Sequence, residues 1–284
     1  MRGVIRLRKE TKGKFNIPAT ILLALLAVIV LVPVFWMVRT SLMSNAEINK
    51  YPPALLPKDW LFSNYGETVR TFRFGRYLIN TLTIALPSVA GVIITASFAA
   101  YAFARMRFPG KRFLFMLVIG SMLMPAAVSL IPIFIMWSKL GFYDTYIPLI
   151  VPQFLGGGAF NIFLIRQFLM GIPKELDEAA MIDSASRLRI LGQVLLPSVK
   201  PVLITVGLFT FIASWNDVLG PVIYLGTETN YTISLGLSMF RGGYGTNWKA
   251  IMAASTMSVM PALALYIAGQ KYFVEGIVLS GLKA

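Results

Sequence analysis

Two chemically versatile residue types are absent from this chain of 284 residues, which contains no cysteine and no histidine. Without cysteine the chain can form no disulfide and offers no thiolate as nucleophile or metal ligand. Without histidine it lacks the side chain that most often serves as a general acid or base near neutral pH. Catalytic triads and metal sites that depend on histidine are therefore excluded, and we expect no metal site.

Charged residues are scarce. They make up 13% of the chain, against about 25% in soluble proteins, whereas 57% of residues are hydrophobic and the mean hydropathy is +0.72. This composition indicates an integral membrane protein. The net charge of +14 would favour nucleic acid as the partner of a soluble protein. Membrane proteins, however, retain Lys and Arg in cytoplasmic loops, so we expect membrane lipid around the chain and no nucleic-acid partner.

A phosphate-binding loop of the form G-x-x-x-x-G-K-[ST] is also missing. The stretch "PGKR" contains Gly110 and Lys111 but lacks the upstream glycine and the following Ser or Thr. We therefore expect no enzyme and no cofactor bound by this chain; if ATP drives its work, another subunit hydrolyses it. The competing class is an intramembrane enzyme, which would need converging acid–base groups or metal ligands. The predicted spans contain one such acid, Asp217.

Six apolar segments are long enough to cross a bilayer, which takes about 20 residues. We predict an all-α polytopic membrane protein with helices over roughly Ile17–Val38, Leu78–Ala102, Phe113–Trp137, Ile147–Leu169, Pro201–Ile223 and Lys249–Gly269. The first segment follows a basic flank but has no small-residue cleavage site, so we interpret it as a retained span and not as a signal peptide.

The placement of Lys and Arg predicts the orientation. Of the 26 basic residues, 17 lie in the amino-terminal tail, in the short loop around "FPGKR", in a polar segment of the second half and in the carboxyl-terminal tail. The positive-inside rule puts these parts, and both termini, in the cytoplasm. The predicted organisation is a basic tail (1–16), a first span (17–38), an extracytoplasmic loop (39–77), a core of five helices (78–272) containing a cytoplasmic loop (166–200), and a cytoplasmic tail (273–284).

Weakly polar residues form stripes along several predicted spans. Gln153, Gly157 and Asn161, for example, follow one another at four-residue spacing. Such stripes allow close helix packing in lipid, which explains most of them. Several such faces, interrupted by Pro and Gly, also suit a bundle that encloses a wettable path. The candidates for this path are Asn80, Gln153, Asn161, Ser214, Trp215, Asn216 and Asp217.

Asp217 is predicted to lie inside the fifth span, nearer its outer end. An ionised acid at the bilayer centre costs roughly 2.5–3.5 kcal/mol, and the cost falls toward the surface. The carboxylate could line the path of a hydroxyl-rich solute, or it could bond neighbouring helices and hold them together. Because the spans contain no second acid, a proton relay is disfavoured.

The segment Lys174–Pro197, "KELDEAAMIDSASRLRILGQVLLP", interrupts the apolar pattern. Pro173 suits a first helical position, and the acids after it favour the positive end of the helix dipole. We predict one helix to about Ile182 and a second capped by Asp183 or Ser184. The second carries an apolar stripe and ends at Pro197, the stripe being Leu188, Leu191 and Leu195. The segment could lie on the membrane surface, but its acids disfavour an anionic leaflet, and its acidic, small and basic faces suit a protein socket.

This segment resembles the EAA loop of ABC importer permeases. Glu178, Ala179 and Ala180 match the EAA letters, Asp183, Leu196 and Pro197 also match, and Val194 replaces the usual Ile. Ser184 stands where that family has a glycine that makes a sharp turn. The resemblance implies that the loop is a coupling helix seated in a cleft of an ATPase subunit. The coupling residues would be Glu175, Glu178, Ala179, Ala180, Asp183, Ser184, Arg187, Leu196 and Pro197.

Stretches along nearly the whole chain, among them "AAYAFARMRFPGKR" and "FTFIASWNDVLGPVIYL", are similar to the second permease of maltose-type sugar importers. The resemblance implies a type I ABC importer permease fold in a bacterial or archaeal cytoplasmic membrane. It implies a second homologous permease, two ATPase subunits that bind ATP and Mg²⁺, and an extracytoplasmic solute-binding protein. The substrate would be a sugar or oligosaccharide, imported by alternating access. The alternative is glycerol phosphate or another polyol or non-sugar solute.

Overall fold

The computed structural model describes residues 17–243 and 247–281, and within these ranges it describes all side chains except those of 240–243 and 271–281. Helices account for all the regular structure of the described ranges, in which no β-strand occurs. The long helices are α1 (Ile17–Ser41), α4 (Phe74–Arg105), α5 (Lys111–Ser121), α6 (Ala126–Lys139), α8 (Ala159–Gly171), α12 (Lys200–Asn216), α14 (Ile233–Gly243) and α15 (Trp248–Gly281). The predicted tail 1–16 lies outside the described residues.

Shorter helices connect or cap the long ones. They are α2 (Asn45–Ile48), α3 (Ser63–Thr71), α7 (Ile147–Ile150), α9 (Glu175–Ile182), α10 (Arg187–Arg189), α11 (Leu196–Ser198) and α13 (Leu219–Tyr224). The 3₁₀ turns Val151–Phe154 and Glu228–Asn230 and a π-helix at Ile190–Leu195 complete the chain.

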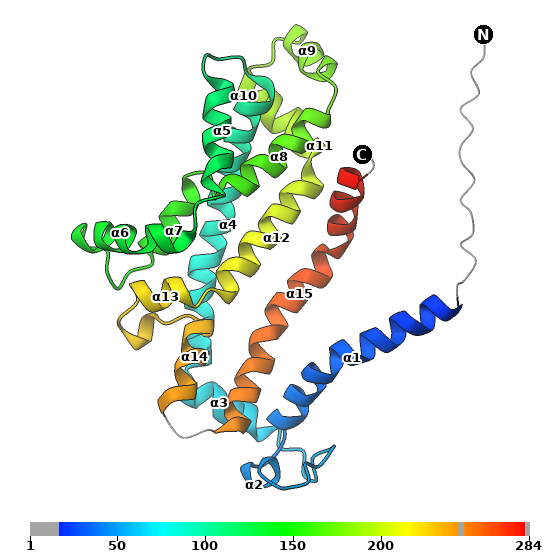
Figure 1. Ribbon diagram of the computed structural model, residues 1–284, viewed down its shortest axis with the longest axis vertical. Coiled ribbons are helices and arrows are strands. Elements are labelled where there is room, and N and C mark those ends of the chain that lie inside the picture. The colour runs from blue at the N-terminus through cyan, green and yellow to red at the C-terminus, as the bar shows by residue number, and fades with distance from the viewer. Residues whose placement is uncertain (1–16, 244–246, 282–284) are drawn as a thin grey trace.

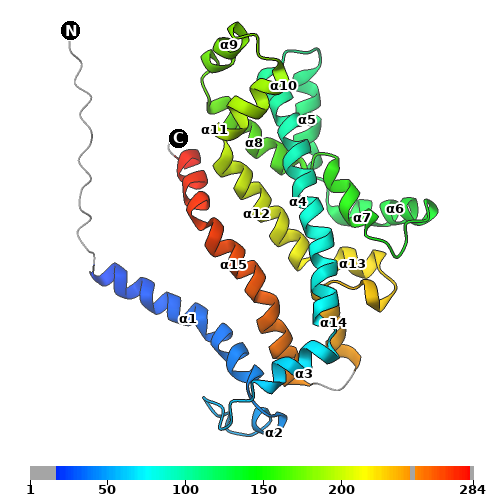
Figure 2. The ribbon, with the colours of Figure 1, turned by 180° about the vertical axis from the view of Figure 1, so that it is seen from behind.

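Helices α4, α8, α12 and α15 form the centre of the molecule (Figures 1 and 2): α12 packs against both α4 and α15, and α4 packs against α8. One apolar cluster joins the carboxyl half of α4 to α8, to the π-helix and to the start of α12. A second joins the amino half of α4 to the end of α12 and to α14 and α15. The first cluster lies beside α9, and the second lies near α3 and α14.

A glycine permits the closest approach between α4 and the chain leading into α8. Gly157 has a φ of +60°, and a Cβ on it would come within 2.3 Å of a methyl group of Val92 on α4. Glycine alone satisfies both conditions, because it tolerates the left-handed region and adds no side chain. Gly156 and Gly158 also have positive φ angles. The predicted spacing of Gln153, Gly157 and Asn161 therefore does not lie along one continuous helix.

Helix α1 diverges from the remaining helices (Figure 1), and its apolar side chains are exposed from Ile17 to Phe35. It becomes buried only at Arg39, Thr40 and Ser41, close to α15. The loop after it is ordered: Ser44 and Glu47 form a reciprocal capping box on α2. Asn64 of α3 donates hydrogen bonds to the carbonyl oxygens of Ser41 and Met43.

Four helical segments of the described chain are long and apolar enough to cross a membrane: Ile17–Ser41, Phe74–Arg105, Ile147–Gly171 and Trp248–Gln270. Two bent pairs raise the number to six if each pair is one span. The predicted third span, Phe113–Trp137, is such a pair, since α5 and α6 meet at 96° and do not form one helix. Pro125 explains the break, because it lacks an N–H and restricts the residue before it.

The predicted fifth span, Pro201–Ile223, is also not one helix. Helix α12 ends at Asn216, and the separate α13 begins at Leu219. At its other end α12 meets the segment Arg187–Ser198 at an angle of 82°. The last candidate span, Trp248–Gln270, agrees with the prediction, but the backbone of its helix α15 continues to Gly281, through most of the segment predicted as a tail.

Candidate functional site

The polar segment after α8 folds as a helical hairpin at one end of the molecule (Figure 1). Helix α9 begins at Glu175, so Pro173 precedes its cap Lys174 and is not the first helical residue. Three acids lie in its first turn: Glu175, Asp177 and Glu178. They lie where the backbone N–H groups and the dipole favour negative charge, which explains why the helix starts there.

The turn after α9 places Ser184 at a φ of +59°. Its N–H donates to the carbonyl of Met181 at 3.0 Å, and the N–H of Ala185 donates to the carbonyl of Ala180 at 3.0 Å. This pair of bonds is the Schellman motif, in which a left-handed residue ends a helix. The serine therefore adopts the conformation for which glycine is usually selected, and the sharp turn is present.

The second half of the hairpin begins at a different cap from the one predicted. Ser186 caps it by accepting the N–H of Arg189, so neither Asp183 nor Ser184 is the N-cap. The apolar stripe is also shifted. Leu191 and Leu195 are buried as predicted, whereas Leu188 is 68% exposed. Ile190 fills the core in its place. The reason is that Ile190–Leu195 forms a π-helix, whose wider turn changes which residues share a face.

The outer surface of the hairpin combines acidic and apolar groups. Glu175, Glu178, Ala179, Asp183, Ser184 and Arg187 are all exposed. Between them lie Leu176, Met181 and Ile182, with exposed fractions of 46%, 53% and 83%. We call this set of nine residues the α9 surface. Three other residues were predicted as coupling residues: Ala180 and Leu196 are half-buried and pack against the apolar cluster, whereas Pro197 is exposed.

Sequence analysis missed the residue that attaches α9 to the helical core. Asp177 is buried, and its Oδ2 lies 3.0 Å from Nε of Arg105, the last residue of α4. Arg105 also donates from Nη2 to the carbonyl of Ile172 at 2.8 Å. The available signal was spacing: Asp177 lies three residues before Ala180, so the two share the inner face of a helix.

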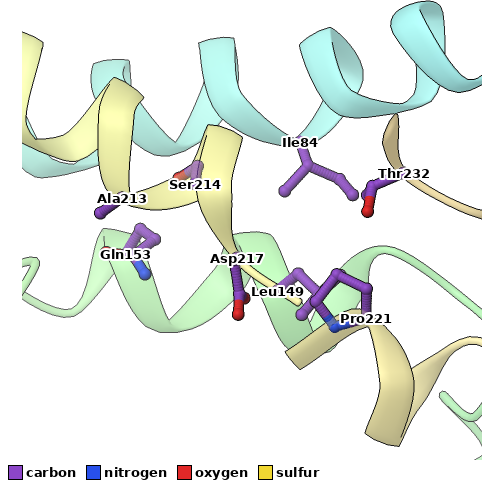
Figure 3. Close-up of a pocket in the computed structure, with 8 residues that line it drawn as sticks. All are labelled: Ile84, Leu149, Gln153, Ala213, Ser214, Asp217, Pro221 and Thr232. Carbon is purple, nitrogen blue, oxygen red and sulfur yellow. The ribbon is translucent and has the colours of Figure 1, made fainter. Parts of the chain in front are cut away.

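A cavity of about 240 Å³ lies near the end of α12, lined by residues from α4, α7, the following 3₁₀ turn, α12, α13 and the loop before α14. Figure 3 shows Gln153, Ser214 and Asp217 around it. The structure thus brings together three residues of the predicted path. The other lining residues are Ile84, Leu149, Ala213, Pro221 and Thr232, so the lining contains one acid and no Lys or Arg.

Asp217 does not lie inside a helix, contrary to prediction. It follows the last residue of α12 with an extended backbone, and its Oδ1 accepts the backbone N–H of Gly220 at 3.1 Å. An aspartate just ahead of a helix commonly stabilises free N–H groups in this way. The carboxylate therefore starts α13 and also faces the cavity (Figure 3).

The remaining path candidates are not part of the cavity lining. Asn80 donates to the carbonyls of Thr229 and Tyr231, and Asn161 donates to the carbonyl of Gly157. The indole N–H of Trp215 donates to the carbonyl of Ser258, and Asn216 is exposed. Asn80 thus bonds a helix to a loop, Asn161 bonds within its own segment, and Trp215 bonds one helix to another.

The loop between α13 and α14 borders the cavity through Thr232 and is bonded to Asp144. The Asp144 carboxylate accepts hydrogen bonds from the side chains of Thr227 and Asn230 and from the N–H groups of Gly226 and Thr227. These bonds, led by that of the Thr227 hydroxyl, lower the pKa of Asp144 from its ordinary 3.8 to about 2. Sequence analysis did not identify this residue, because its partners lie more than 80 positions away.

Comparison with known proteins covers nearly the whole chain. The sequence pattern of the family described as "Binding-protein-dependent transport system inner membrane component" matches residues 91–278. The osmoprotective compounds uptake permease protein GgtD of Synechocystis sp. is 34% identical over 78% of this chain and 74% of that protein. The arabinooligosaccharides transport system permease protein AraQ of Halalkalibacterium halodurans is 30% identical over 86% of each chain.

The fold also has a counterpart among solved structures. A chain in the crystal structure of a bacterial ABC transporter involved in the import of the acidic polysaccharide alginate superposes with a TM-score of 0.82. It is 27% identical, and the match covers 91% of this chain and 96% of that one. The overall arrangement of helices is therefore already known from a transporter.

Proposed function

Because this chain belongs to the family of binding-protein-dependent transport system inner membrane components, we propose that it is a permease subunit of an ATP-driven importer of sugars or oligosaccharides. The membership of the importer permease family that the EAA loop suggested is thereby confirmed. The relatives named for arabinooligosaccharides and for alginate support a carbohydrate as the substrate.

We propose that the chain crosses the membrane six times, with α5 and α6 together counted as one span and α12 as another. The four apolar helical segments, of which Ile147–Gly171 is interrupted before α8, supply four crossings, and α5–α6 and α12 supply the other two. Both termini then lie on the same side as the α9 surface, and the excess of Lys and Arg there supports a cytoplasmic location. The segment 39–77, with α2 and α3, lies on the opposite side.

The α9 surface is the proposed contact for an ATPase subunit, and it is the observation that carries the function. The large apolar side chains of Leu176, Met181 and Ile182 are exposed on it to 46%, 53% and 83%. Exposed apolar side chains ringed by charge are typical of a protein–protein contact. Glu178 and Ala179 lie on this surface, where an acid can pair with a basic socket and a methyl side chain permits close approach.

The partners follow from this arrangement. ATP and Mg²⁺ would be bound by two ATPase subunits, while a second permease would complete the transmembrane path, and a solute-binding protein would deliver the substrate to the outer face. ATP binding would draw the ATPase subunits together and shift α9, so that the cavity becomes accessible from alternate sides. The cavity residues Gln153, Ser214 and Asp217 are the proposed solute contacts of this chain.

A neutral hydroxylated solute is favoured over glycerol phosphate by the charge of the cavity. Its lining contains Asp217 and no cation, whereas a phosphate group would be repelled by a carboxylate unless a base compensated it. Amide, hydroxyl and carboxylate groups instead match the donors and acceptors of a sugar.

The test is to purify the complex with its binding protein and to measure ATP hydrolysis in the presence of candidate solutes. We expect a neutral sugar or oligosaccharide to stimulate the rate and glycerol phosphate to leave it unchanged. Stimulation by glycerol phosphate alone would contradict the proposed substrate class. A complex that contains no ATPase subunit would contradict the proposed function.

A further inference from the structure

Helix α9 is held against the rest of the protein more by an ion pair than by apolar packing. Among the eight residues of α9, Asp177 is the one that is buried. The large apolar side chains Leu176 and Ile182 are exposed, and Met181 is 53% exposed and lines a cavity beside the ion pair. Ala180, half-buried against the core cluster, adds only a methyl contact. The position of α9 therefore depends on where the Asp177 carboxylate finds its partner.

That partner is Arg105. The two side chains are 12% and 6% exposed, and Oδ2 lies 3.0 Å from Nε. Removing either member of such a pair leaves the other as an uncompensated charge away from water, which is strongly unfavourable. The pair is consequently expected to stay together when α9 changes its position.

Arg105 is the last residue of α4, a continuous helix of 32 residues. At the other end of α4, Asn80 bonds the carbonyls of Thr229 and Tyr231, and the Thr81 hydroxyl accepts the N–H of Ile233. Ile84 lines the solute cavity one turn further on. With a rise of 1.5 Å per residue, the helix spans about 37 Å between Asn80 and Arg105. One helix thus links the base of α9 to the cavity and to the loop that borders it.

The space around the ion pair leaves room for movement. A second cavity of about 210 Å³ lies beside the ion pair and is lined by Arg105 and Asp177 themselves, with Arg107, Met181 and Arg187 among its other lining residues. Within the described structure Asp177 Oδ1 is buried without a hydrogen-bond partner, and the 3.0 Å contact between Oδ2 and Arg105 Nε is an ionic contact without hydrogen-bond geometry. The hairpin is therefore anchored at one carboxylate oxygen, and the cavity around it allows α9 to tilt about that point.

We propose that the Arg105–Asp177 ion pair is the joint through which displacement of α9 moves α4, and with it the solute cavity. This inference rests on the proposed function, because it assumes that an ATPase subunit displaces α9. Asp177 and Arg105 are positioning residues in this mechanism, since neither touches the solute.

The test uses the complete complex in lipid vesicles, with its binding protein and the solute that stimulates its ATPase. Asp177→Asn and Arg105→Gln should each lower solute uptake at least tenfold and abolish stimulation of ATP hydrolysis, while the ATPase subunits remain bound. The exchange variant Arg105→Asp with Asp177→Arg should recover uptake to within about threefold of wild type. Arg107→Gln, an exposed arginine lining the same cavity, is the matched control and should transport normally.

Two results would contradict the proposed role of the Arg105–Asp177 ion pair. The first is normal uptake by both single variants. The second is loss of the ATPase subunits from the single variants without recovery in the exchange variant, which would show that the pair serves folding only. If the exchange variant does not assemble, Asp177→Glu provides the same test, because it keeps the charge and should retain uptake. Glu178→Lys, measured in parallel, separates the two proposals. Normal uptake by Glu178→Lys would contradict the proposed function. Reduced uptake by Glu178→Lys together with normal uptake by Asp177→Asn would contradict only the proposed role of the ion pair.

Discussion

Ala185 donates its backbone N–H to the carbonyl oxygen of Ala180 at 3.0 Å, and this bond closes the end of α9 around a left-handed residue. The left-handed residue is Ser184, in the position where the EAA pattern has glycine. The turn is therefore set by the backbone bonds of the hairpin, and the serine accepts a conformation that is unfavourable for a residue with a Cβ.

Ser184→Gly should stabilise the hairpin by about 1 kcal/mol, because glycine adopts a positive φ without the steric cost. The expected observation is slower hydrogen exchange of the α9 amides, by about fivefold. Ser184→Val should speed the same exchange, since a β-branched residue is poorly tolerated there. Faster exchange in the glycine variant would show that the turn is not strained.

Gly157→Ala should destabilise the core by about 2–4 kcal/mol. The new methyl group would meet Val92 while the backbone holds a φ of +60°, so overpacking and backbone strain would both act. Thermal unfolding of the purified protein measures the effect. Gly120→Ala is the matched control, because nothing lies within 4 Å of the added atom, and its midpoint should stay the same or rise. Equal midpoints for the two variants would contradict the close approach of α4.

Asp144→Ala should loosen the loop between α13 and α14, which loses the acceptor of four hydrogen bonds. The amides of Gly226 and Thr227 should then exchange faster than in wild type. Asp59→Ala, an exposed acid of the segment 39–77, should leave that rate unchanged.

The same loop should respond to acid. Because the folded pKa of Asp144 is about 2, below its ordinary 3.8, its contribution is fully present above about pH 4. It is lost as the pH falls toward 2. Protection of the Gly226 and Thr227 amides should fall over that interval in wild type and stay flat in Asp144→Ala. A loss centred near neutral pH would contradict this cause.

Gln153→Leu should lower uptake about two- to tenfold, the effect of losing one hydrogen bond worth about 0.5–1.5 kcal/mol to the solute. The substitution does not alter the binding protein, which is a separate chain, so a change in uptake is assigned to the cavity. Asn161→Leu is the comparison. The Asn161 amide bonds the Gly157 carbonyl in the wild type, so its loss should lower the unfolding temperature and leave uptake per folded complex close to the wild-type rate. Normal uptake by Gln153→Leu would remove this residue from the path.

The apolar runs predicted where most helices lie because hydropathy responds directly to the lipid environment. The breaks were harder to predict. Pro125 lies within an unbroken apolar run, and hydropathy cannot distinguish a straight span from two helices at 96°. Asp217 likewise caps the start of α13 through a local bond from the Gly220 N–H, and a hydropathy scale contains no information on such bonds.

The hairpin shows the same division. Its acids and the EAA match indicated α9 correctly, and the exposed face of Glu178 and Ala179 follows from that helix. The ion pair of Asp177 with Arg105 joins residues 72 positions apart, and Asn230 reaches Asp144 across a similar separation. Only the packed arrangement of helices brings such partners together, so a single sequence could not predict them.

The central claim is that α9 receives the work of ATP hydrolysis, and Glu178→Lys tests it most directly. The variant should fold and reach the membrane as wild type does, because Glu178 is exposed and contributes nothing to the core. The reversed charge should prevent stimulation of ATP hydrolysis by the solute-loaded binding protein and abolish uptake into vesicles. Uptake at the wild-type rate, with stimulation intact, would contradict the claim.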